Sequence, residues 1–175
     1  MPNWCMNRLT VTGDEHERMA ELWRADNVLS TVIPEPVEYS RDDLAKLQEF
    51  ADTQAWMKRI VTTENAPDWW RLMHWGTDRD VVEAAVVTAS NDATVIQFRT
   101  AWSPPNAGLR TISGLYPTLR CELKCYEPLW SFAAHTVFLA GEIISDECHE
   151  CGAGFTRIVA ECGWEEEEVE RDATD

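Results

Sequence analysis

Long apolar runs are missing from this sequence, and glycine is scarce. No stretch approaches the roughly 20 apolar residues that a helix needs to cross a bilayer. The N-terminus, MPNWCMNRLTVTGDE, has no basic region followed by an apolar stretch, so we predict no secretory signal. Eight glycines among 175 residues leave little material for a loop that binds phosphates. We therefore expect a protein of the reducing cytoplasm, in which cysteines stay thiols or bind metal.

Sequence motifs of catalysis are also missing. The sequence contains neither a GxSxG nor an HExxH motif to accompany its four histidines, which are His16, His74, His135 and His149. A lone histidine is more often a surface or packed side chain than a base. We therefore predict no catalytic residue, although His74 stands out because Trp75, Asp78 and Asp80 are its neighbours in the sequence.

Positive charge is the third shortage. Lys and Arg number 15 against 31 Asp and Glu, which gives a net charge of −16. From Gly141 onward there are 12 acids and 2 bases, a net of −10, against 19 acids and 13 bases, a net of −6, in residues 1–140. A negative field of this kind repels nucleic acid and attracts basic protein surfaces. The composition therefore predicts a partner with a basic surface and no direct binding of nucleic acid.

The alternation of apolar and polar residues indicates strands. Residues 94–105, TVIQFRTAWSPP, predict a central strand in which Ile96, Phe98, Thr100 and Trp102 share one face. Similar patterns predict further strands over residues 4–13, 81–89, 119–126, 130–139 and 155–160. Residues 90–92 provide a hairpin turn into the central strand.

Helical spacing predicts three helices, over residues 14–26, 40–60 and 106–117. The first two begin with patterns typical of a capping box, formed by Asp14 with Glu17 and by Ser40 with Asp43. Residues 28–36 are expected to be extended, and residues 62–80 to form an irregular loop rich in tryptophan. Loops of that length often carry function.

In chain order these elements form a split β-α-β-β-α-β arrangement with additions. We predict an α+β fold: a ferredoxin-like antiparallel sheet with helices on one face, a helical and Trp-rich insertion at about residues 31–80, and extra C-terminal strands. The ferredoxin-like domain spans residues 1–140. Residues 141–175 form an acidic C-terminal extension that contains a CxxC motif and ends in a frayed tail.

Four short motifs resemble a known family. MPNWCMNRLTVTG at the N-terminus, HWGTDRD at residues 74–80, FRTAWSPP at 98–105 and YEP at 126–128 together resemble the YubB-type ferredoxin-like family of phage and conjugative-plasmid proteins, whose function is unknown. The resemblance implies a ferredoxin-like fold, an origin in a mobile element and the cytoplasm of a bacterial host. His74, Arg79 and Leu129 depart from the family's pattern, and the acidic extension lies outside it.

The cysteines permit two interpretations. Cys148 and Cys151 form a CxxCG knuckle, and Cys162 follows eleven residues later. A structural zinc ion requires four ligands, so these three are either a zinc site completed by another residue or plain thiols. A thioredoxin-like role would need a helix directly after Cys151, and we predict none. The remaining cysteines are expected to be small core residues, namely Cys5, Cys121 and Cys125.

Seven of the nine tryptophans fall into two groups. Those at apolar positions of predicted elements should be core, and they are Trp4, Trp23, Trp56 and Trp102. Those in the 62–80 loop either form a pocket or partner surface, or hold the insertion to the sheet. The predicted binding residues are Trp69, Trp70, His74, Trp75, Asp78, Asp80 and Trp102 around that loop, and Glu165, Glu166, Glu167 and Glu168 in the tail.

Two function classes follow. The first is a non-enzymatic accessory protein of a mobile element that binds a basic host protein through its acidic surface, as a nucleic-acid mimic or an inhibitor of host defence. The second is a small-ligand binder or enzyme that uses a cleft at the Trp-rich loop.

Overall fold

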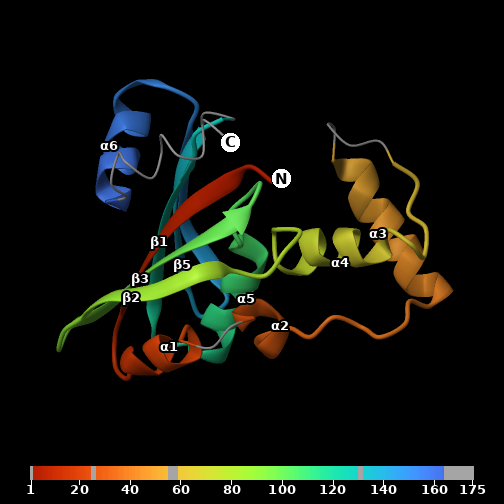
Figure 1. The fold of residues 1–175 in the computed structure, drawn as a ribbon. Coiled ribbons are helices and arrows are strands. Elements are labelled where there is room, and N and C mark those ends of the chain that lie inside the picture. Colours follow the sequence, from red (N-terminus) through yellow and green to blue (C-terminus); the bar gives the residue numbers. More distant parts are fainter. Residues whose placement is uncertain (1, 25–26, 55–58, 130–131, 164–175) are drawn as a thin grey trace.

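One six-stranded antiparallel sheet organises the protein in its computed structural model (Figure 1). The structure describes residues 2–24, 27–54, 59–129 and 132–163. The strands lie in the order β2-β3-β1-β4-β5-β6. They are β1 (Trp4–Thr12), β2 (Val82–Ala89), β3 (Ala93–Ala101), β4 (Arg120–Glu127), β5 (Phe132–Leu139) and β6 (Glu142–His149). The helices are α1 (Glu17–Leu22), α2 (Val28–Val32), α3 (Arg41–Thr53), α4 (Ala66–His74), α5 (Asn106–Leu115) and α6 (Gly152–Cys162).

Four strands and two helices form the ferredoxin-like core. The chain order β1-α1-β2-β3-α5-β4 and the sheet order β2-β3-β1-β4 are those of the split β-α-β-β-α-β arrangement. The central strand β1 pairs on both sides, so that Leu9 lies opposite Ile96 of β3 and Leu123 of β4. The predicted α+β ferredoxin-like fold is confirmed.

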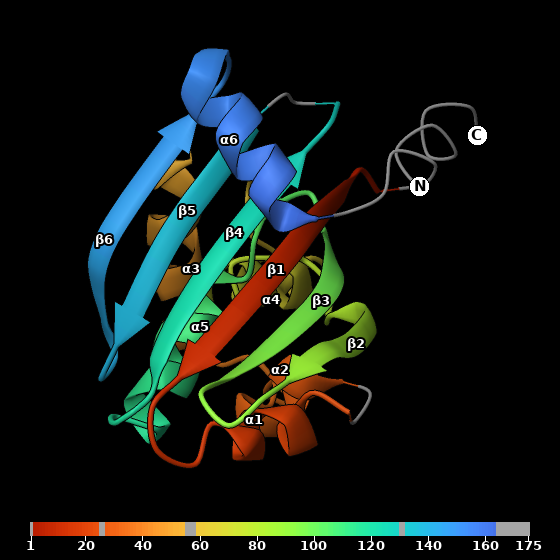
Figure 2. The same cartoon turned by 90° about the vertical axis from the view of Figure 1, so that its left-hand side faces the viewer.

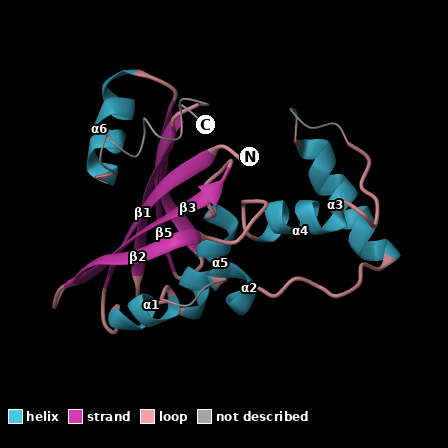
Figure 3. Ribbon diagram, in the orientation of Figure 1, coloured by secondary structure: helices cyan, strands magenta, loops and turns pink. Residues whose placement is uncertain are grey.

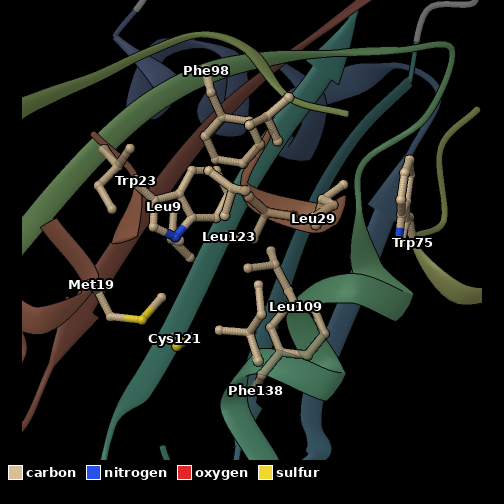
Figure 4. Close-up of a cluster of buried hydrophobic side chains, with 14 of the residues drawn as sticks. Leu9, Met19, Trp23, Leu29, Trp75, Phe98, Leu109, Cys121, Leu123 and Phe138 are labelled. Carbon is tan, nitrogen blue, oxygen red and sulfur yellow. The ribbon is translucent and has the colours of Figure 1, made fainter. Parts of the chain in front are cut away.

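Apolar side chains fill the space between this sheet and the helices on one of its faces (Figure 4). The rings of Trp23, at the end of α1, and Phe98 of β3 have centroids 4.3 Å apart. Leu109 and Ile112 of α5 are fully buried against the same face. Each such side chain contributes roughly 1.5–3 kcal/mol when it leaves water, so this cluster fixes which face of each strand points inward.

The insertion between α1 and β2 contains three helices, and α3 and α4 extend from the sheet on the side away from α6 (Figures 1 and 3). Helix α3 begins with the predicted capping box, in which Ser40 Oγ accepts from the Asp43 N–H and Asp43 accepts from the Ser40 N–H. It ends at Thr53, earlier than predicted. The extended piece predicted at 28–36 and the irregular loop predicted at 62–80 were wrong, because they contain α2 and α4.

The first helix is also shorter than predicted. It begins at Glu17 after the N-cap His16, so the predicted capping box at Asp14 was wrong. Residues 13–16 form a turn instead, with Glu15 at a φ of 68°.

The C-terminal part extends the sheet and then crosses it. Strand β5 is the strand predicted at residues 130–139, whereas β6 lies in a segment for which no strand was predicted. Helix α6 packs on the face opposite α5 (Figure 2). Ile158 and Cys162 of α6 bury against Met6 of β1 and Tyr126 of β4. The strand predicted at 155–160 was therefore wrong, and the expectation that helices occupy one face holds for the core but not for α6. Among the described residues, we find no helix with the length and apolar character of a membrane span.

Candidate functional site

The tryptophans of the predicted loop are buried. Trp69, Trp70 and Trp75 expose 2%, 8% and 3% of their surface. Trp69 packs edge-on against Phe50 of α3, with ring centroids 6.4 Å apart, and Trp70 packs edge-on against Trp75 at 5.7 Å. The structure thus supports the interpretation in which these rings hold the insertion to the sheet.

Polar contacts fasten the insertion further. The Trp75 indole N–H donates to the Ile33 carbonyl at 3.0 Å. Arg71 pairs with Glu35 at 2.7 Å and lies over the Trp75 ring, 5.9 Å from its centroid. These contacts span more than 30 residues of sequence, so they connect α4 to the segment that follows α2.

Asp80 has a structural role of the same kind. Its carboxylate accepts from the backbone N–H groups of Leu29 at 2.9 Å and Ser30 at 2.8 Å. These are orphan donors in the first turn of α2, so Asp80 satisfies them from a distant point of the chain. The predicted binding residues Trp75 and Asp80 therefore stabilise the insertion.

Trp102 directly follows β3 in a strained turn. Its φ is +68°, which is uncommon for a bulky residue, and the Ser103 N–H donates to the Ala101 carbonyl at 2.8 Å. A hydrogen bond across one residue of positive φ is the pattern of a rare, strained γ-turn. The turn carries the indole outward, where Trp102 is 40% exposed. The prediction that Trp102 is a core residue was wrong.

A buried polar network holds this turn. The Asn7 amide donates to the Thr100 hydroxyl at 2.9 Å and to the Cys5 carbonyl at 2.8 Å. The Thr100 hydroxyl donates to the Ser103 carbonyl at 2.8 Å, and the Trp102 N–H donates to the Asn3 carbonyl at 2.8 Å. The network therefore fixes the backbone on both sides of Trp102.

Two further motifs meet at the same end of the sheet. The Ser103 hydroxyl donates to the Gly76 carbonyl at 2.6 Å, and the Thr77 hydroxyl donates to the Ala101 carbonyl at 2.8 Å. Glu127 of the YEP motif is fully buried. It follows Cys125 by two residues, and Cys125 lies opposite Asn7 in the pairing of β1 with β4. Three of the four motifs therefore contribute hydrogen bonds to the turn after β3.

Sequence reasoning missed the network residues Asn7, Thr77, Thr100 and Ser103 as a group. One signal could have found Asn7, which stands on the inward face of β1 between Cys5 and Leu9. A buried amide at such a position is costly unless it is hydrogen-bonded, so it indicates a polar partner on a neighbouring strand.

Asp78 connects Trp102 to a small cavity beside α4. This cavity, of about 140 Å³, is lined by Arg59, Asn65, Asp68, Trp69, Leu72 and Asp78. Asp78 is hydrogen-bonded to the Trp102 indole, and its Oδ1 is buried without a hydrogen-bond partner among the described residues. Burial raises the pKa of Asp78, while Arg79 opposes that shift. Of the predicted binding residues, the structure brings together Trp69, Asp78 and Trp102 here.

His74 lies at a second, larger hollow. Its Nδ1 is 2.9 Å from the Trp70 carbonyl, and its ring stacks on the Trp70 ring with centroids 4.3 Å apart. We name this hollow the His74 groove. It has a volume of about 430 Å³ and is lined by Met73, His74, Ala107, Arg110, Thr111, Gly114 and Gly141.

Several predicted residues lie outside the part of the chain that the structure describes. They are Trp56 in the insertion and the tail residues Glu165, Glu166, Glu167 and Glu168.

The cysteines of the knuckle lie where β6 meets α6. Cys148 and Cys151 are exposed, whereas Cys162 is buried under α6. Within the described ranges, no three His, Cys, Asp or Glu side chains are placed to hold a metal ion, so zinc at Cys148, Cys151 and Cys162 stays a prediction. Cys5, Cys121 and Cys125 are buried, as predicted.

Contrary to our prediction, a helix does follow Cys151, which is the N-cap of α6. Cys148 nevertheless differs from the activated thiol of a redox pair, whose pKa is lowered. Burial raises the pKa of Cys148, and the nearby acids Asp146 and Glu150 add to the shift. The electrostatic surroundings thus keep Cys148 in the thiol form.

Comparison with known proteins supports the fold. No family model matches the chain, and no curated protein matches it. Among solved structures, the chain is similar to the crystal structure of protein api92 from Yersinia pseudotuberculosis, described with the family name DUF1281. The TM-score is 0.54 and the identity 11%, over 87% of this chain and 99% of that chain. At this identity the similarity shows a shared fold and nothing about activity.

Proposed function

We propose that this is a non-enzymatic binding protein that engages a basic protein surface through its acidic C-terminal part. The observation that carries the proposal is the distribution of charge. Residues 141–175 hold −10 of the net −16 in one fifth of the chain. A field so concentrated raises the association rate with a basic partner and disfavours nucleic acid.

The fold supports this proposal through the position of β6 and α6. β6 is a terminal strand of the sheet, and α6 lies on the face opposite the main core (Figure 2). Five acids and one base lie between Gly141 and Gly163, and Glu142 and Glu150 among them are exposed. Within the described residues, these charges therefore lie on, or between, an edge strand of the sheet and the helix that covers the face opposite the main core.

The family resemblance suggests which partner to seek. If the chain comes from a phage or plasmid, its target is a protein of the bacterial host in the cytoplasm. A basic groove that normally binds nucleic acid is the surface that clustered carboxylates fit best, which corresponds to a nucleic-acid mimic that inhibits host defence.

Capture from bacterial lysate at two salt concentrations tests the proposal. The full chain should recover a basic protein at 50 mM NaCl and lose it at 500 mM, because screening weakens contacts between exposed charges. Reversing Glu165, Glu166, Glu167 and Glu168 to lysine should abolish the capture.

The matched control reverses four exposed acids elsewhere, Glu21, Glu38, Glu49 and Glu64, which changes the net charge equally. Capture that survives this control but not the tail reversal supports a specific acidic surface. Equal loss in both variants would mean that net charge alone is responsible, and capture that is insensitive to salt would contradict the proposal.

A second function, small-ligand binding, is favoured by one observation. Trp102 is held in a strained conformation with an exposed indole beside Asp78, and strain of this kind gathers at ligand sites. A thermal-shift screen of metabolites tests it: a compound that raises the melting temperature of the wild type but not of Trp102→Ala would support this function. A screen in which no compound raises the melting temperature would count against it.

A further inference from the structure

The His74 groove has a lining of unusual charge for this protein. The chain carries 31 acids, yet none of the seven residues that line the groove is acidic, and two of them are Arg110 and His74. Ala107 also lies in the first turn of α5, where the helix dipole is positive. The lining residues therefore carry no negative charge, although Glu142 pairs with Arg110 beside the groove.

The histidine is fixed in one orientation and one tautomer. Because the Trp70 carbonyl can only accept, His74 Nδ1 must carry the proton of that 2.9 Å hydrogen bond. Stacking on Trp70 holds the ring plane. His74 Nε2 has no hydrogen-bond partner among the described residues, so it is free to bind a ligand, as a donor when the ring is protonated.

Arg110 of the groove is held by contacts with the β5–β6 turn. Its Nε donates to the Gly141 carbonyl at 2.8 Å and its Nη2 lies 3.3 Å from Glu142. Nη1 has no such partner in the described part of the chain, and the side chain is 54% exposed. The pair with Glu142 is exposed and therefore weak, so an incoming anion competes with it at little cost.

Three of the seven lining residues have a small side chain or none, namely Ala107, Gly114 and Gly141. A Cβ atom added to Gly114 would lie 3.5 Å from the Cα of Gly141. A Cβ atom added to Gly141 would lie 3.3 Å from the Cα of Gly114. The two glycines therefore let α5 and the β5–β6 turn approach closely, with Met73 as the apolar wall. A volume of about 430 Å³ lies within the roughly 300–1,000 Å³ of small-molecule sites and exceeds what a bare ion needs.

We propose that the His74 groove binds a small organic anion, whose carboxylate or phosphate group lies between Arg110 and His74 and whose apolar body contacts Met73. Guanidinium and imidazolium groups both donate to the oxygens of such anions. Gly141 and Glu142, the first residues of the acidic C-terminal part, lie at this site, but the proposal does not require a protein partner.

Titration of the ¹⁵N-labelled full chain with two model anions, benzoate and phenyl phosphate, tests the proposal by NMR. At least one of them should shift the amide signals of Thr111, Gly114 and Gly141 in a saturable way, and the stronger binder identifies the anion class. Benzyl alcohol and benzylamine have the same ring without the negative charge, and they should cause no saturable shift.

Three variants locate the site. His74→Gln and Arg110→Gln should each weaken anion binding about tenfold or more, since each removes a charge-assisted hydrogen bond. Thr111→Glu leaves both partners in place and adds a carboxylate to an exposed position of the groove, so it should abolish binding without loss of folding. His149→Gln and Arg18→Gln, on other surfaces, should bind like the wild type.

The proposal is overturned if neither anion gives saturable shifts, if benzyl alcohol binds as tightly as the anions, or if Thr111→Glu binds like the wild type.

Discussion

Asn7 is the residue on which the turn after β3 depends. Its side-chain amide donates to the Thr100 hydroxyl, which donates to the Ser103 carbonyl. Asn7 and Thr100 are both fully buried. Replacing Asn7 by Ala should lower the free energy of unfolding by about 1–3 kcal/mol, because buried polar groups lose their partner. Urea denaturation measures this. Asn3→Ala is a control, since Asn3 contributes its backbone carbonyl, and it should change stability little.

Glycine and alanine should differ in stability when they replace Trp102. Glycine adopts a φ of +68° without strain and alanine does not. We therefore expect Trp102→Gly to be more stable than Trp102→Ala by about 1 kcal/mol, the reverse of the usual order in regular structure. Thermal unfolding of both variants decides this, and an alanine variant equal to or better than glycine would show that the turn relaxes.

Asp78 should make stability depend on pH in an unusual direction. Its pKa is raised from the ordinary 3.8 by burial, so the native state holds this proton more tightly than the unfolded state does. The contribution of Asp78 to stability is then largest below pH 3.8 and decreases as the pH rises through the native pKa. Relative to wild type, Asp78→Asn should gain stability between pH 4 and pH 7, as measured by urea denaturation. Asp68→Asn, at the same cavity, serves for comparison.

At the scale of elements, Glu147 at the end of β6 connects the sheet to α6. It accepts from Arg157 of α6 at 2.5 Å and lies near His135 at 3.2 Å and His149 at 3.4 Å. These partners lower the pKa of Glu147 to about 2. A lowered pKa stabilises the fold above the ordinary value of 4.5 and ceases to do so as the pH falls towards 2.

Glu147→Gln should therefore flatten the loss of stability between pH 4.5 and pH 2, which acid titration followed by circular dichroism measures. Glu150→Gln, three residues away and exposed, should leave the titration unchanged. An unchanged acid transition in Glu147→Gln would show that this cluster does not anchor α6.

The elements that the sequence predicted well are those in which one face is buried and the other is wet. The alternation in β1, β3 and β4 follows directly from that arrangement. α6 was mistaken for a strand because Ile158 and Val159 are β-branched and two glycines begin the helix. Its helical spacing was nevertheless present in Phe155, Ile158 and Cys162, which all face the sheet.

The site was less predictable than the fold. Asp78 and Trp102 were predicted to lie together, and they do, but Trp69, Trp70 and Trp75 turned out to be packing residues. Composition cannot distinguish an exposed tryptophan from a buried one in a segment without clear periodicity. The partners of Asn7 could not be identified either, because Thr100 is 93 residues away and the contact depends on the strand register.

At the scale of the whole molecule, the net charge of −16 should govern the response to salt. Self-repulsion destabilises a compact chain of one charge sign, and salt screens it. Raising NaCl from 20 to 200 mM should therefore raise the midpoint of urea denaturation. A constant or lower midpoint would indicate that the pairs between β6 and α6 contribute more than the repulsion does.

The contact between Asp80 and the start of α2 has a consequence for how this protein can change. Because Asp80 binds the amides of Leu29 and Ser30, the chain returns after fifty residues to the point from which it departed. The two ends of the insertion are thus held together, so the length of the chain between them does not affect the position of β2. Related chains could therefore shorten, lengthen or exchange α3 and α4 while β1 and β3 keep their register, and an engineer could graft a foreign module at the same junction.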